Sequence, residues 1–126
     1  MQIPGTIAVA LIGLVVVFQL ALVAGAPWGR AAWGGQNPGT LPRRLRLASL
    51  VAAAVLLFLA WTVLAASGLM SASLLPRSWL DTATWLITAY FVLGAVVNLI
   101  SRSPVERVWA PVSLATAVCC ALIAIG

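Results

Sequence analysis

The residues best suited to chemistry gather in one polar stretch, Ala26–Leu47, with the sequence APWGRAAWGGQNPGTLPRRLRL. This stretch holds four of the seven arginines, two of the six tryptophans, four glycines and three prolines. Guanidinium groups suit phosphate through a planar pair of donors, and indole rings favour the headgroup level of a bilayer. The stretch therefore predicts contact with membrane lipids, anionic ones included. With two arginines from a later segment, the candidate headgroup contacts are Trp28, Arg30, Trp33, Arg43, Arg44, Arg46, Arg102 and Arg107.

Side chains for catalysis or metal binding are scarce. The chain has no histidine and only two acids, Asp81 and Glu106, each in a position typical of helix capping. Cys119 and Cys120 are adjacent in an apolar run, where cysteine is typically a small packing residue. The glycines of the polar stretch lack the preceding strand and the lysine of a phosphate-binding loop. We therefore expect no catalytic residue, no metal and no cofactor, in a protein that is not an enzyme.

The rest of the chain is almost continuously apolar. Hydrophobic residues make up 63% of the 126 residues and charged residues 7%, against roughly 25% charged in soluble domains. A membrane span needs about 20 apolar residues, so the chain has room for about four. We predict one all-α transmembrane domain, 1–126, built as a bundle of four antiparallel helices. The expected helices are about 4–25, 42–67, 79–100 and 104–125, with a loop at 26–41.

Local signals support these boundaries. Pro42 is suited to the start of the second helix, with Thr40 as its cap, and Gly68 is suited to the position after its end. Two further starts carry capping-box patterns: Ser78 with Asp81, and Ser103-Pro104 followed by Glu106. Ala24-Gly25-Ala26 resembles a signal cleavage site. No basic residue precedes Arg30, however, so we expect the first segment to remain as a span.

The distribution of arginines predicts the orientation. With four spans, Arg30, Arg43, Arg44, Arg46, Arg102 and Arg107 fall on one side, and Arg77 alone falls on the other. The positive-inside rule then places the 26–41 loop in the cytoplasm and both termini outside, in a multi-pass protein of the inner (plasma) membrane. It also explains the net charge of +5 without nucleic-acid binding. The alternative to lipid contact is that these arginines only direct insertion.

Polar residues within the predicted spans form two groups. Interhelical hydrogen bonds and a small polar cavity are alternative roles for the first, Gln19, Ser49, Asn98 and Ser113. Interfacial aromatic belts and an apolar pocket for a lipid-like ligand are alternatives for the second, Trp61, Trp85, Thr88 and Tyr90. Tyr90, Gly94 and Asn98 recur every four residues and should share one helix face.

Partners and families give weaker indications. Ser113, Ala117 and Ala121 form a stripe of small residues that would let a second copy or another membrane protein pack closely. A small multidrug-resistance exchanger is similar only in length and span number, because the first helix here lacks an acid. The motifs GAPWGRAAWGG, LPRRLR and NLISRSPVER resemble a family of small bacterial four-helix integral membrane proteins with no assigned activity. That resemblance covers most of the chain and implies four spans, but no catalytic residues.

Two functional classes follow from the sequence. The first is a non-enzymatic accessory or lipid-interacting membrane module. The second is an oligomeric small-molecule carrier or channel component. An oligomeric pore or a polar central cavity would distinguish the second class from the first.

Overall fold

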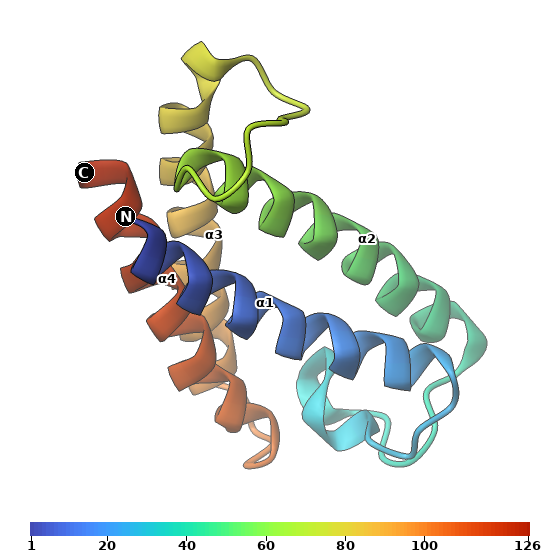
Figure 1. Cartoon of the computed structure of the whole chain (residues 1–126). Helices are drawn as coiled ribbons and strands as arrows, with labels where there is room; N and C mark the ends of the chain where they lie inside the picture. The colour runs from blue at the N-terminus through green and yellow to red at the C-terminus, as the bar shows by residue number, and fades with distance from the viewer.

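The computed structural model describes all 126 residues and is entirely helical (Figure 1). Its four long helices are α1 (Gln2–Val23), α2 (Arg43–Ala66), α3 (Leu80–Leu99) and α4 (Trp109–Ile125). Four short 3₁₀ turns accompany them: η1 (Gly29–Ala31), η2 (Trp33–Gly35), η3 (Arg77–Trp79) and η4 (Glu106–Val108). The predicted all-α class is confirmed, and the first three helices lie within two residues of the expected bounds.

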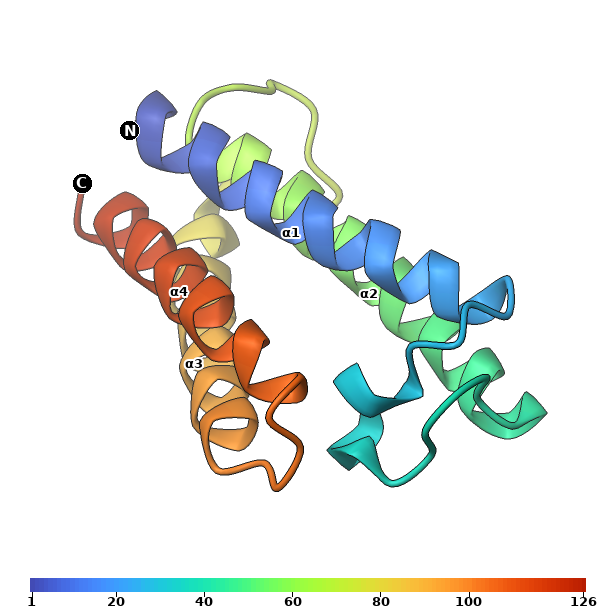
Figure 2. The same ribbon diagram turned by 90° about the horizontal axis from the view of Figure 1, so that it is seen from below.

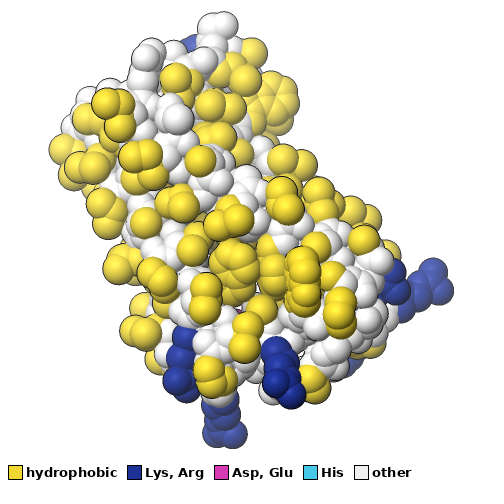
Figure 3. Space-filling model, turned by 60° about the horizontal axis from the view of Figure 1, so that its bottom comes forward, with side chains coloured by type: hydrophobic (Ala, Val, Ile, Leu, Met, Phe, Trp, Pro, Cys, Tyr) yellow, Lys and Arg dark blue, Asp and Glu magenta, His cyan; other side chains and the backbone are white.

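All four helices are long and apolar enough to cross a membrane, when α3 and α4 are taken together with the 3₁₀ turns before them as Arg77–Leu99 and Glu106–Ile125. Only 22% to 33% of each apolar window is buried inside the protein, so most of these side chains face outward. Leu86 and Leu93 of α3, for example, are 66% and 64% exposed. Figure 3 shows apolar side chains over much of the molecule and most of the visible arginine side chains toward one end. This much apolar surface suits lipid rather than water as the surrounding medium.

The helices are arranged as two pairs that diverge toward one end. α2 lies along α1, and α4 lies along α3 (Figures 1 and 2). The pairs meet chiefly where α1 contacts α4, at the end that carries both termini. A core cluster drawn from all four helices, including Ile12, Leu56, Phe91 and Cys120, joins the pairs. The opposite end is wider, and the loop between α1 and α2 lies there.

The ends of α2 follow from local sequence. Pro42 precedes the helix with an extended backbone (ψ 158°), and the helix proper begins at Arg43. After Ala66 the chain passes through Gly68 at φ +81°, a conformation that glycine adopts without a steric penalty. The predicted stop at Gly68 is therefore confirmed. Thr40 does not cap the helix, because its hydroxyl donates to the Gly25 carbonyl at 3.0 Å.

The two predicted capping boxes are wrong. No side-chain cap bond is present at the start of η3, α3, η4 or α4. α4 begins at Trp109 rather than at 104, and the Ser103 hydroxyl donates instead to the Arg30 carbonyl. Glu106 accepts a hydrogen bond from the Gly34 amide at 2.9 Å. Both side chains thus bond backbone groups of the loop, the Arg30 carbonyl and the Gly34 amide, which would otherwise lack partners.

Candidate functional site

A cavity of about 1230 Å³ lies between the two helix pairs at the wide end. Its apolar wall includes Phe18 from α1, Leu56 from α2, and Phe91 and Val97 from α3. Its polar lining includes residues from α1, α3, α4 and the loops: Gln19, Arg30, Gln36, Asn98, Ser101, Arg102, Ser103, Glu106 and Ser113. The cavity is therefore amphipathic, with polar groups concentrated at the arginine end.

The segment 29–35 forms one side of this cavity and is held by hydrogen bonds to the α3–α4 pair. Trp109 donates its indole N–H to the Ala31 carbonyl at 3.0 Å, beside the Ser103 and Glu106 contacts already described. The ring of Trp109 also packs on Phe18 of α1, with centroids 4.6 Å apart. These contacts set how far apart the two pairs stand at the wide end.

A further bond ties the same segment to α2. Trp33 donates its indole N–H to the Ser49 hydroxyl at 3.0 Å, and Ser49 is fully buried. Trp33 also has a positive φ of 51°, uncommon for a residue with a side chain. Trp33 as a whole is nevertheless 41% exposed. The segment therefore bridges both helix pairs, while Trp33 stays partly accessible.

Glu106 is the one acidic side chain on the cavity and is only 5% exposed. Its Oε2 accepts the Gly34 hydrogen bond, and no arginine nitrogen lies within 4.0 Å of the carboxylate. Oε1 accepts no hydrogen bond in the protein, yet it is not among the side-chain atoms that are fully shielded. This second oxygen therefore remains open to a donor from the cavity.

Three of the four predicted intramembrane polar residues meet at this cavity. Gln19, Asn98 and Ser113 line it, whereas Ser49 lies apart and bonds Trp33. None of the three makes a side-chain hydrogen bond to another helix. The interhelical-bond alternative is wrong for them, and the polar-cavity alternative describes their placement. The Oε1 atom of Gln19 is buried without any partner.

The predicted helix face of α3 is confirmed. Tyr90, Gly94 and Asn98 all line the cavity, as their four-residue spacing predicts. Gly94 also faces α4, since a Cβ added there would stand 3.6 Å from the Ser113 hydroxyl oxygen. Ala117, in the small-residue stripe of α4, is 2% exposed and belongs to the core cluster. Two members of that stripe are thus engaged within the chain.

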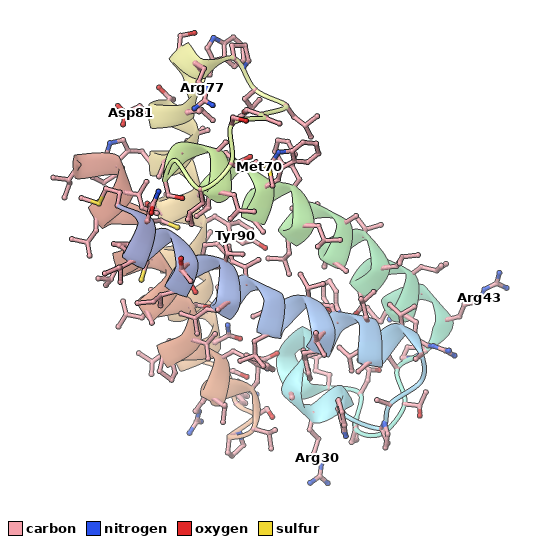
Figure 4. The ribbon with its side chains drawn as sticks, viewed as in Figure 1. Arg30, Arg43, Met70, Arg77, Asp81 and Tyr90 are labelled. Atoms are coloured by element: carbon pink, nitrogen blue, oxygen red, sulfur yellow. The ribbon has the colours of Figure 1, made fainter.

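The candidate arginines separate into three groups. Arg30 and Arg102 line the cavity and are exposed. Arg46 and Arg107 hold backbone carbonyls: Arg46 donates Nε and Nη2 to Val23, and Arg107 donates Nε to Ser101. Arg43 and Arg44 are exposed at the start of α2, outside the cavity, and Figure 4 shows Arg43 projecting away. Trp28 is 51% exposed, with its ring stacked beside Phe18.

The four residues of the second predicted group have different surroundings. Trp61 donates to the Ala72 carbonyl, the Thr88 hydroxyl donates to the Thr84 carbonyl, and Tyr90 lines the large cavity. Trp85 is 45% exposed and lines neither cavity. A smaller apolar cavity of about 490 Å³ does lie between α2 and α3, but its wall includes Phe58, Thr62, Trp79 and Leu86. An apolar pocket shared by the four predicted residues stays a prediction, since side-chain direction as well as depth along the helix decides which residues meet.

The cysteines and the comparisons add no chemistry. Cys119 and Cys120 are free and buried in the core, in keeping with a packing role. No group of three or more potential metal ligands is present. No protein-family model, curated protein or solved structure matches the chain. The resemblance to small bacterial four-helix membrane proteins therefore stays a prediction.

Proposed function

We propose that this protein is a non-enzymatic, multi-pass membrane protein that binds a phospholipid between its two helix pairs. The observation that carries the proposal is the amphipathic cavity at the arginine end. Its volume of about 1230 Å³ exceeds the upper range of about 1,000 Å³ for small-molecule sites, so it has room for part of a lipid. Phe18, Leu56 and Val97 would contact the acyl chains.

We place the four helices as an antiparallel bundle across the plasma membrane, with the arginine end in the cytoplasm and both termini outside. Arg77 and Asp81 lie at the end opposite Arg30 and Arg43 (Figure 4), which supports this threading under the positive-inside rule. The mouth of the cavity then lies at headgroup level on the cytoplasmic side. Arg30 and Arg102 are the cations on its rim, and each exposed guanidinium can turn toward a phosphate.

Native mass spectrometry of the purified full chain, with identification of the retained lipids, tests the proposal. The double variant Arg30→Gln/Arg102→Gln removes the rim cations, and Arg43→Gln/Arg44→Gln removes the same charge outside the cavity. Both leave four arginines on the cytoplasmic side. A contribution of about 1 kcal/mol for each basic residue corresponds to a loss of more than tenfold in lipid affinity for the first variant. We expect little change in the second.

A steric pair tests the acyl part of the site. Val97 and Val96 are 53% and 49% exposed on the same helix, but only Val97 lines the cavity. Val97→Trp should reduce lipid retention, and Val96→Trp should not. Equal retention in both would refute lipid binding in the cavity. The same spectra report the oligomeric state, and a pore-forming oligomer without bound lipid would favour the carrier or channel alternative.

A further inference from the structure

The cavity contains an unneutralised acid. Glu106 is nine-tenths buried, bonds one neutral backbone amide, and has no arginine within 4.0 Å. A carboxylate withdrawn from water needs a cation or several donors to offset its lost hydration. Its Oε1 is the atom left without a donor, and this atom is open to the cavity. A donor group on an occupant of the cavity can therefore reach this oxygen.

A second acceptor on the same cavity also lacks a donor. The Oε1 atom of Gln19 is fully buried, and it is the only buried side-chain polar atom in the chain without a partner. Buried polar groups in native proteins nearly always have a partner, so one that does not needs an explanation. An occupant with hydrogen-bond donors would reach the open Oε1 of Glu106 directly, and the shielded Oε1 of Gln19 once that side chain turns into the cavity.

Resting on the proposed lipid-binding function, we propose that the cavity selects phospholipids with a primary ammonium in the headgroup, as in phosphatidylethanolamine. An ammonium offers three donors and a positive charge, enough for both Glu106 and Gln19. The phosphodiester beside it carries the negative charge that Arg102 and Arg30 on the rim would contact. Acid and arginines thus match the two charges of one zwitterionic headgroup.

The same chemistry predicts weaker binding of the other common headgroups. A choline headgroup carries the positive charge but has no N–H to donate to a carboxylate. A glycerol headgroup has hydroxyl donors but no positive charge to balance Glu106. A glycerol hydroxyl can donate to the carboxylate, but the ammonium adds the attraction of its own positive charge to the same bond. The expected order of affinity is therefore ethanolamine, then glycerol, then choline.

Competition between three lipids in the delipidated full chain tests the order. Phosphatidylethanolamine, phosphatidylglycerol and phosphatidylcholine with matched acyl chains are added in equal amounts, and the bound species are counted by native mass spectrometry. Wild-type protein should prefer the ethanolamine lipid over the choline lipid by about tenfold, as expected for one charge-assisted bond. In a separate arm, soluble phosphoethanolamine is added at equal concentration. We expect it not to displace the lipids, because it lacks the acyl chains that contact the apolar wall.

The decisive variant is Glu106→Gln, whose amide oxygen can still accept the Gly34 hydrogen bond while the charge is lost. It should abolish the ethanolamine preference and leave binding of the glycerol lipid within about twofold. Asp81→Asn, the matched control at the opposite end, should change nothing. If Glu106→Gln does not fold, Gln19→Leu removes the second acceptor and should reduce the preference instead.

The outcomes separate the two proposals. Equal binding of the three lipids by wild-type protein overturns the headgroup selection and leaves lipid binding intact. A preference that persists unchanged in both Glu106→Gln and Gln19→Leu also overturns it. Failure of wild-type protein to bind any of the three lipids overturns the proposed function itself. Competition by soluble phosphoethanolamine at equal concentration would assign the site to a free phosphoamine rather than to a lipid.

Discussion

Substitution of Gly35 by alanine should loosen the contact between the 29–35 segment and the α3–α4 pair. Gly35 has φ +71°, and a Cβ built on it would overlap the Cβ of Ser103. It would also stand 2.9 Å from the Ser103 hydroxyl oxygen and 3.0 Å from the Arg30 carbonyl oxygen. Those last two atoms are themselves hydrogen-bonded. An alanine can therefore fit only if Ser103 moves and releases Arg30.

The expected cost has two parts. A residue with a Cβ loses about 1 kcal/mol in a left-handed conformation, relative to glycine. Release of the Ser103–Arg30 hydrogen bond adds about 1 kcal/mol. Gly39 supplies the control, because it has φ +85° and no heavy atom within 4 Å of its added Cβ. Gly35→Ala should therefore lower the free energy of unfolding by about 2 kcal/mol, and Gly39→Ala by about 1 kcal/mol.

Unfolding in mixed micelles with increasing SDS, followed by tryptophan fluorescence, measures both values. Ser103→Gly removes the obstructing Cβ. In that background Gly35→Ala should cost only the conformational part, about 1 kcal/mol. Such non-additivity is the mark of a direct contact. Equal losses for Gly35→Ala and Gly39→Ala, with additive behaviour in the double variant, would refute the placement of this segment against Ser103.

Two further predictions concern the arginines and the threading. Arg46→Gln removes the two hydrogen bonds, 3.0 and 2.8 Å long, that hold the Val23 carbonyl at the end of α1, and should lower stability by about 1 kcal/mol. Arg44 makes no such bond, so Arg44→Gln should leave the free energy of unfolding unchanged within error. An equal loss of stability in both variants would show that the Arg46–Val23 hydrogen bonds do not contribute. For topology, cysteines placed at Gln36 and Ala72, both exposed, are offered to an impermeant thiol reagent on whole cells. Labelling at 72 alone supports the proposed orientation, and labelling at 36 alone reverses it.

The helices could be predicted from the sequence because apolar runs and helix-end residues each act locally along the chain. Long apolar runs, Gly68 after α2 and Pro42 before it each act locally, and the structure agrees with them. The face shared by Tyr90, Gly94 and Asn98 also follows from the period of one helix alone. Such features do not depend on how the helices pack against each other.

The start of α4 shows where local reasoning fails. Ser103 and Glu106 match a capping box, yet each side chain bonds a backbone group of the 29–35 segment, more than 70 positions earlier in the chain. A pattern of four residues cannot report a partner so distant. The only local hint is the glycine content of that segment, since Gly34 and Gly35 allow its backbone to approach another element closely.

The sequence indicates which polar residues line the cavity, but not that they come together at one position in the fold. Gln19, Asn98 and Ser113 were identifiable as polar residues in apolar runs, but their meeting depends on the divergence of the two helix pairs. Glu106 is not among the site residues predicted from the sequence, because a helix-capping role is sufficient to account for an acid at that position. One useful signal was available: it is one of only two acids in the chain, and it lies beside the most basic side of the predicted topology.

The wide end also explains why an occupant should be expected at all. Helix pairs in lipid gain dispersion energy by close packing, and an unfilled apolar wall loses those contacts. The bonds from Trp109 and Glu106 to the 29–35 segment oppose that closure by fixing a spacer between the pairs. Water gains few hydrogen bonds against Phe18, Leu56 and Val97, whereas an acyl chain restores the missing contacts. The lost packing is thus recovered most readily by an amphiphile, whose polar head would meet the arginines and Glu106 at the mouth.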